Sequence, residues 1–157
     1  MKKTISACAF FTIISFLAAC GGGDKTPQDA ANNTETSNGN PSYDPNRGTG
    51  KFTTVEVGAT LDVTKATEGK KTFDVKCSAC HKLTAEKLVG PGWAGVTSRY
   101  QPAWIMNFIT NTDEMLNKDP KAQAQLEICL VRMPNQSLSD DEARHLLEYM
   151  RQNDGVK

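Results

Sequence analysis

The sequence is short of histidine and of net charge, and each shortage counts against a class of function. It has two histidines, and its 18 basic residues balance 18 acidic ones. A structural zinc site normally takes two pairs of ligands, but the Cys-x-x-Cys at residues 77–80 is not repeated and only His145 remains beyond His81. A nucleic-acid-binding protein normally has a basic footprint, which a net charge of zero does not supply. We therefore expect no nucleic-acid partner.

Long hydrophobic runs are also missing. The N-terminal apolar run covers residues 5–17, follows Lys2 and Lys3, and is too short for a comfortable membrane span. Such a segment is typical of a targeting signal. It ends in Leu-Ala-Ala-Cys at residues 17–20, which resembles the lipobox of bacterial lipoproteins. The resemblance implies a signal peptide over residues 1–19 and a lipid on Cys20. An ordinary secretory signal beside an unrelated cysteine is the alternative.

A lipid on Cys20 would anchor the protein to a membrane of the bacterial cell envelope, facing the periplasm. Several acyl chains give a stable anchor, because each buried methylene contributes about 0.8 kcal/mol. Residues 21–51 are rich in Gly, Asn, Thr, Ser and Pro and bury too little apolar surface to offset their ordering entropy. We expect residues 20–51 to form a flexible tether with an r.m.s. span of roughly 30 Å. The folded domain is then expected over residues 52–157.

The chemistry of this domain is indicated by Cys77-Ser78-Ala79-Cys80-His81. This C-x-x-C-H pattern is the attachment motif of a c-type haem. Two thiols at this spacing can add across the two vinyl groups of one porphyrin, and the imidazole that follows can reach the iron. The pattern predicts one covalent haem c, attached through Cys77 and Cys80, with His81 as an axial ligand.

Two other interpretations of the cysteine pair stay open. Thioredoxin-like enzymes use a Cys-x-x-Cys as a redox dithiol, but they carry it after a strand in a βαβ unit, and the residues before Cys77 are predicted to be helical. A structural zinc site is the other interpretation, although a second ligand pair is missing. Mass spectrometry separates the dithiol enzyme from the haem protein, because thioether-linked haem leaves no free thiols at Cys77 and Cys80.

Start motifs and apolar spacing predict a mostly helical domain. Asp62 or Thr64 can cap a helix that runs to about residue 76, and Pro102 can start the next one. Asp-Pro at residues 119–120 starts a third helix, and the capping box at residues 139–142 starts the last. Residues 52–61 alternate only in part, which predicts a short strand or an extended lead-in. Cys129 is expected to be a small buried hydrophobic residue, with a reactive thiol as the alternative.

Beyond the haem motif, Gly90-Pro91 lies in a loop rich in glycine and proline. Together with the Met-Pro pair at residues 133–134, this resembles the class I cytochromes c over about residues 63–153. The resemblance implies an all-α, small cytochrome c fold with three to five helices around one covalent haem. It also implies that the Pro91 carbonyl accepts a hydrogen bond from His81, which would fix the imidazole tautomer.

In the same family the first and last helices cross, with a glycine and an aromatic residue against a leucine and an aromatic residue. Gly69 and Phe73 match one side of this crossing, and Leu146 and Tyr149 match the other. Glycine costs about 1 kcal/mol relative to alanine inside a helix, and it is more plausible where another backbone packs closely. The resemblance therefore implies that Gly69 lies at a close helix contact.

The resemblance implies a methionine as the second axial ligand, in a Met-Pro segment before the last helix. Met133 lies in such a segment and is our candidate. Met115, in a polar stretch expected to be a loop, is the reserve candidate. His145 is the rival for bis-histidine ligation, although it lies on the last helix, where solvent-facing histidine is ordinary. Met106 and Met150 lie in predicted helices and are expected to fill the core.

Two axial ligands from the chain leave no open position on the iron, which argues against catalysis. We expect a monomeric one-electron carrier, not an enzyme, that passes electrons between respiratory redox proteins. Contacts with such partners are weak and small, and the haem edge near the two thioethers would be their site. The alternative is a haem-based sensor or small-ligand binding protein in which Met133 is displaceable.

Overall fold

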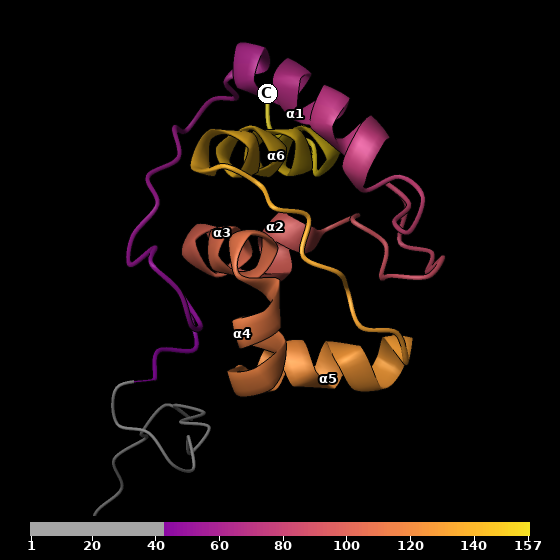
Figure 1. The fold of residues 1–157 in the computed structure, drawn as a ribbon. Helices are drawn as coiled ribbons and strands as arrows, with labels where there is room; N and C mark the ends of the chain where they lie inside the picture. The colour runs from indigo at the N-terminus through magenta and orange to yellow at the C-terminus, as the bar shows by residue number, and fades with distance from the viewer. Residues whose placement is uncertain (1–42) are drawn as a thin grey trace, which may run out of the picture. The chain divides into compact units, whose positions relative to one another are not determined.

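The computed structural model describes residues 43–157; the predicted signal peptide, Cys20 and most of the predicted tether lie outside the described residues. Within residues 43–157 the chain forms six helices and no strand, which confirms the all-α class (Figure 1). The number exceeds the expected three to five, because the single-turn α2 and the short α4 lie in stretches without a clear helical pattern. The helices are α1 (Val63–Lys76), α2 (Val96–Arg99), α3 (Pro102–Thr110), α4 (Thr112–Lys118), α5 (Pro120–Cys129) and α6 (Asp140–Asn153).

The predicted start motifs are used as helix caps. Asp62, and not Thr64, is the N-cap of α1, and its side chain accepts the backbone N–H of the third residue after it at 3.0 Å. Asp119 caps α5 in the same way at 2.9 Å. At α6, Ser139 and Glu142 form both bonds of the capping box. Each cap satisfies backbone donors that have no partner within the helix.

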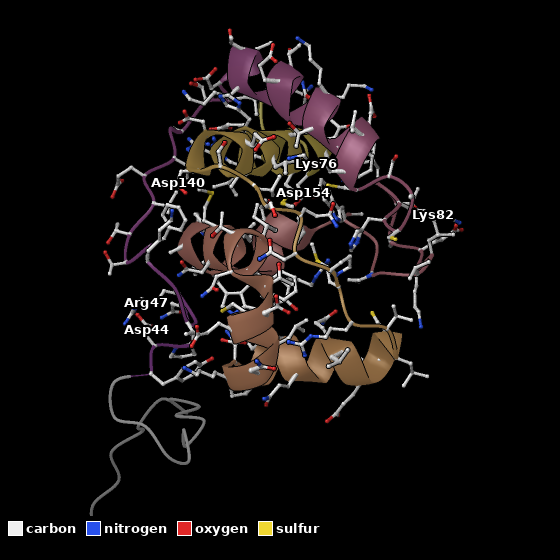
Figure 2. All side chains as sticks on the ribbon, in the orientation of Figure 1. Asp44, Arg47, Lys76, Lys82, Asp140 and Asp154 are labelled. Carbon is white, nitrogen blue, oxygen red and sulfur yellow. The ribbon has the colours of Figure 1, made fainter. Side chains whose placement is uncertain are left out.

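α1 packs against α6, as the matched residues predicted (Figure 1). A Cβ added to Gly69 would lie 2.5 Å from the carbonyl carbon of His145, closer still to its oxygen, and 2.9 Å from the Tyr149 Cβ. Phe73 and Tyr149 pack with ring centroids 5.6 Å apart, and Leu146 is buried. The missing side chain of Gly69 therefore lets the two backbones approach. At the end of α1, the Lys76 ammonium pairs with Glu142 in the first turn of α6 (Figure 2).

The prediction of a polar loop around Met115 is wrong, because these residues form α4. Met115 is fully buried and Leu116 nearly so, whereas Asp113 and Asn117 are exposed. The polar residues form the outer face of a short amphipathic helix, and seven residues are too few for the pattern to be clear. The Met115 sulfur accepts the backbone N–H of Thr49 at 3.0 Å.

The packed part of the chain begins before residue 52, earlier than the predicted end of the tether. Asn107, which is fully buried, donates to the carbonyls of Arg47 and Phe52, both at 2.8 Å, and accepts the Phe52 N–H at 2.9 Å. Tyr43 donates its hydroxyl proton to Asp119 at 2.6 Å. Buried polar groups need partners, so residues 43–51 are held by hydrogen bonds rather than by their own small apolar surface.

Residues 52–61 continue as an extended lead-in, which is the second of the two predicted forms. Phe52, Val55 and Val57 pack against the main core. That core takes all its buried members from residues 73–150. No helix in the described part of the chain is long and apolar enough to cross a membrane.

Replacing Tyr43 with phenylalanine is expected to lower the free energy of unfolding by about 1 kcal/mol, because a hydrogen bond to the Asp119 carboxylate is lost. Burial, assisted by Asp119, raises the pKa of Tyr43 above its ordinary value. The phenol therefore remains a donor, and we expect the same difference from about pH 6 to pH 9 in urea denaturation. Tyr149→Phe is the matched control, because the Tyr149 hydroxyl has no hydrogen-bond partner among the described residues. Equal losses in the two variants would contradict the prediction.

Candidate haem site

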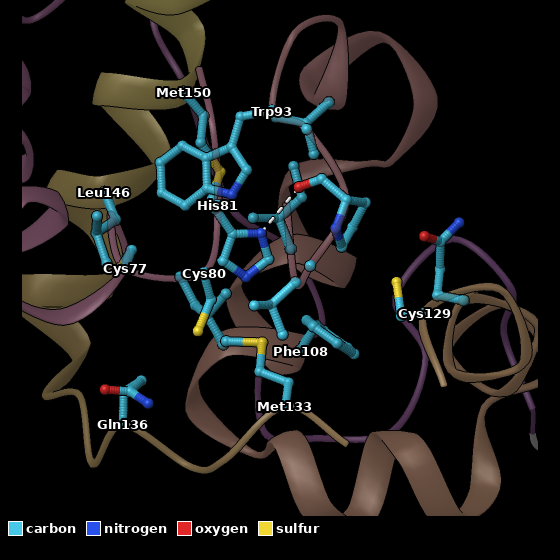
Figure 3. A pocket seen from close by; sticks show the side chains of 18 of the residues that line it. Cys77, Cys80, His81, Trp93, Phe108, Cys129, Met133, Gln136, Leu146 and Met150 are labelled. Carbon is cyan, nitrogen blue, oxygen red and sulfur yellow. Dashed lines mark hydrogen bonds between the residues drawn. The ribbon is translucent and has the colours of Figure 1, made fainter. Parts of the chain in front are cut away.

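The structure brings the predicted site residues together around one cavity. Cys77, Cys80, His81, Pro91 and Met133 all line it (Figure 3). Its free space is about 1280 Å³, open solvent at the mouth included. Most of the other lining side chains are apolar and come from α2, α3, α5, α6 and the loops between them. The lining is thus apolar enough for a flat organic cofactor.

The cysteine motif forms a turn at the end of α1. The backbone N–H groups of Cys80 and His81 both donate to the Cys77 carbonyl at 3.0 Å, and Cys77 itself donates to Phe73 at 2.9 Å. Neither cysteine forms a disulfide. Burial raises the pKa of the Cys77 thiol to about 11, although the charge of Lys76 acts in the opposite direction. The turn places two sulfur atoms and an imidazole at one edge of the cavity.

His81 is oriented by the hydrogen bond that the sequence predicted. Its Nδ1 lies 2.9 Å from the Pro91 carbonyl oxygen, which can only accept, so Nδ1 carries the proton. Burial lowers the pKa of His81, and the bond to Pro91 opposes this in part. The ring is therefore neutral at neutral pH, and the Nε2 lone pair is available to a metal.

Gly90 is a positioning residue that sequence reasoning treated only as part of a turn. A Cβ added to it would lie 2.8 Å from both ring nitrogens of His81 and closer still to the carbon between them. The loop is fixed at this point, because Val89 and Gly90 both donate to the Cys80 carbonyl, at 3.2 and 2.9 Å. Only glycine, which has no Cβ, leaves room for the His81 imidazole at this point.

Gly90→Ala is expected to displace the His81 ring or the loop and to lower the free energy of unfolding of the haem-loaded protein by about 2 kcal/mol. Denaturation followed by haem absorbance measures the loss, and the spectrum of the folded variant reports on His81 ligation. Gly58→Ala is the matched control, because a Cβ at Gly58 meets only the Thr60 backbone, with the oxygen at 3.3 Å and the nitrogen at 3.9 Å. A parent-like spectrum and stability in Gly90→Ala would contradict the steric role.

The loop beneath His81 is also tied to the end of the chain. Asp154 accepts hydrogen bonds from the backbone of Gly95 at 2.6 Å and of Thr97 at 2.8 Å, and from the Thr97 hydroxyl at 2.6 Å (Figure 2). These bonds satisfy the first turn of α2. Asp154 thereby connects the residues that follow α6 with the loop that orients the imidazole, which no local pattern in the sequence indicates.

Met133 lies across the His81 ring from the Pro91 hydrogen bond (Figure 3). Its segment is anchored by Arg132, whose Nη2 donates to the Asp113 carbonyl and to the Asn117 side chain on α4, both at 3.0 Å. Sequence reasoning missed Arg132, because its partners belong to the stretch that was expected to be a loop. A thioether is thus held opposite the imidazole without breaking a helix.

The other ligand candidates lie elsewhere. Met106 and Met115 are buried in the core and do not line the cavity. His145 is half-buried on α6 and does not line it either. Met150 lines the cavity but lies beside Trp93, on the side of the ring that carries the Pro91 bond (Figure 3). Met133 is therefore the one of these side chains that faces the free side of His81.

Cys129 is buried, as expected for a small hydrophobic residue, and it also lines the cavity. Two arginines line the cavity as well, Arg99 and Arg132, and Arg99 donates to the Ala94 carbonyl at 2.6 Å. Cationic side chains at an otherwise apolar cavity suit the acidic groups of a porphyrin. Paired thiols, a neutral imidazole, a thioether and apolar walls are together the donor set of a haem c site, so the residues present fit this cofactor.

Comparison with known proteins agrees with this geometry. The family model described as "Cytochrome c" matches residues 66–154. Among solved structures, a cytochrome c from Rhodothermus marinus is 33% identical, with a TM-score of 0.64 over 67% of this chain and 90% of that chain. An engineered form of that protein, bound to a carbene intermediate, is 32% identical, with a TM-score of 0.61 over the same shares.

The comparison with curated protein sequences returned no match. The family match alone spans more than half of the chain, and the structural similarity extends over most of the Rhodothermus protein. This chain belongs to the cytochrome c family, and its cofactor is a covalently bound haem c.

Proposed function

We propose that this protein is a one-electron carrier in which Cys77 and Cys80 bond the haem and His81 and Met133 are its axial ligands. The observation that carries the proposal is the position of Met133 opposite the free Nε2 side of His81, while the other methionines lie in the core or on the opposite side. A histidine and a methionine are the ligand pair of electron-transfer cytochromes c.

When bound, the haem supplies reversible one-electron chemistry between ferrous and ferric iron. The bond from His81 to Pro91 makes the imidazole a better donor, and the Met133 thioether favours the ferrous state and raises the potential. The apolar walls keep water away from the iron, which tunes the potential further. With His81 and Met133 both holding the iron, no position would be left for a substrate.

We also propose that Cys20 is lipidated and holds the domain at a membrane of the bacterial envelope, facing the periplasm. Its support is the Leu-Ala-Ala-Cys motif at residues 17–20 behind an apolar run. Respiratory redox proteins in the same compartment are then the proposed donor and acceptor. Labelling with a radioactive fatty acid is expected for the parent protein and not for Cys20→Ser; label in both would remove this part of the proposal.

The experiment that tests the electron carrier is a mass measurement combined with a redox titration of the purified, processed protein. We expect the polypeptide mass plus one haem, no free thiols at Cys77 and Cys80, and a single reversible one-electron transition. A colourless protein with an unaltered polypeptide mass and two reactive thiols would instead assign it to the dithiol enzymes.

A second candidate function is binding of a small ligand at the iron after displacement of Met133. The way in which residues 131–138 are held favours this function. In the described structure their hydrogen bonds involve side chains, such as those of Arg132 and Asn135. Segments with few backbone bonds open most easily. Carbon monoxide separates the two functions: a spectral change of the reduced protein at neutral pH supports ligand binding, and its absence supports the carrier.

A further inference from the structure

A group of exposed apolar side chains lies at the mouth of the haem cavity. They come from the loop before Gly90 and from the end of α5, and we call them the rim patch. Soluble proteins rarely expose several large apolar residues together without a binding role. The rim patch consists of Leu88 (48% exposed), Val89 (38%), Ile128 (63%), Leu130 (83%) and Val131 (53%).

The two halves of the rim patch adjoin each other and the haem attachment site. The Lys87 ammonium donates to the Ile128 carbonyl at 3.0 Å, which joins the loop to the end of α5. Val89 and Val131 both line the cavity while remaining partly exposed. The Val89 N–H donates to the Cys80 carbonyl at 3.2 Å. The patch therefore lies beside one of the two cysteines that bond the haem.

Leu130, in the rim patch, has an unusual backbone conformation. Its backbone is left-handed, with φ 61° and ψ 6°, at the C-cap of α5. Glycine or asparagine is the usual residue at such a position, because a larger side chain is strained there. Strained residues concentrate at functional sites. Leu130 is one of the most exposed leucines of the described chain, and its side chain contributes nothing to the core. The strained backbone instead presents this side chain in the rim patch.

Two ion pairs lie next to the rim patch. Lys82, on the outer loop after α1, pairs with Glu86 at 2.8 Å (Figure 2). Arg132 pairs with Asp113 at 3.3 Å. Lys87 donates to a carbonyl of the patch itself. Glu127, exposed beside Ile128, and Lys87 have no ion-pair partner in the described part of the chain, but their charges are opposite. The patch thus has no net charge that would attract a strongly acidic or basic partner.

We propose that the rim patch is the docking surface for an electron-transfer protein whose own docking face is apolar and uncharged. The inference rests on the proposed carrier function and names the chemistry of the partner. An apolar contact beside Cys80 brings the partner to the haem attachment edge without long-range steering, so association depends little on ionic strength.

Electron self-exchange between ferrous and ferric copies of the haem-loaded protein tests this, because a second copy presents the same apolar face without net charge. The rate follows from NMR line widths of mixed samples. We expect it to change less than about twofold between roughly 20 and 500 mM salt. The double variant Ile128→Ser with Leu130→Asn, in which asparagine suits the left-handed backbone, is expected to lower it at least about tenfold.

Val63→Ser is the matched control and is expected to leave the rate unchanged. Val63 is 62% exposed and lies at the start of α1, about 20 Å along the helix from Lys76. Oxidation by ferricyanide, which is too small to need the patch, is expected to be alike in all three proteins. If the parent itself fails to react with ferricyanide, the carrier function fails, and not the docking surface alone.

Three results would overturn the docking surface while leaving the carrier intact. One is a self-exchange rate in the double variant equal to that of the parent. Another is a rate that falls or rises steeply with salt, which would indicate charged docking. The third is a parent that forms a stable dimer, or binds phosphatidylcholine vesicles, through the patch, since its occupant would then be a second copy or a lipid surface.

Discussion

Gly69→Val is expected to lower the free energy of unfolding by about 4 kcal/mol or more, which is exceptional for one substitution. The Cβ alone would lie 2.5 Å from the carbonyl carbon of His145 and closer to its oxygen. Both partners are helix backbone, so neither can move away without separating α1 from α6. Because valine has a better helix propensity than glycine, the whole loss is attributable to the clash. Thermal and urea denaturation of the haem-loaded protein measure it.

Thr67→Val is the control for Gly69→Val. Thr67 lies on the exposed face of the same helix and is also β-branched. The change replaces its hydroxyl with a methyl group and removes only an exposed hydrogen bond to the Val63 carbonyl. We expect its stability to stay within about 0.5 kcal/mol of the parent. Gly69→Ala should fall between the two variants. If Gly69→Val unfolds within about 1 kcal/mol of the parent, the helix contact described above is not the one in solution.

Met133→Ala is expected to abolish the low-spin spectrum of histidine–methionine ligation completely while the haem stays attached. The thioethers proposed at Cys77 and Cys80 would not depend on the distal ligand. Loss of the thioether that favours ferrous iron should also lower the reduction potential, and the open position should make carbon monoxide bind readily. Absorption spectra and a redox titration of the purified variant measure these changes.

Met115→Leu is the control for Met133→Ala, because Met115 is fully buried in α4 and does not line the cavity. Its spectrum and potential are expected to equal those of the parent, with a stability change below about 1.5 kcal/mol. Parent-like spectra in Met133→Ala would assign the axial position to another side chain, and loss of the low-spin spectrum in Met115→Leu would point to a rearranged α4.

Local patterns predicted the helices whose start depends on neighbouring residues. The caps at Asp62, Asp119 and Ser139 form as expected, because a capping side chain bonds backbone groups two or three positions away. The short α4 was not predicted. Its polar residues are the exposed side of a helix whose other side buries Met115, and which side faces the core depends on segments far away in the chain.

The order of residues 43–51 was likewise not predictable from their composition. They are polar, but Asn107 and Asp119 are buried and need hydrogen-bond partners, which the segment around Arg47 and the Tyr43 hydroxyl supply. Arg132 is a similar case, because its anchoring partners lie on α4. In each case the sequence contained the residues but not the pairing, which links positions tens of residues apart.

The sequence by itself determined what can be decided within a few residues: the cofactor, the motif proposed to hold it at Cys77, Cys80 and His81, and the beginnings of the long helices. Only the tertiary structure decided which methionine faces His81, that Gly90 makes room for the imidazole, and that apolar side chains gather beside Cys80. The physical reason is that covalent and capping chemistry is local, whereas burial and steric contact are set by whichever distant segment packs against a residue.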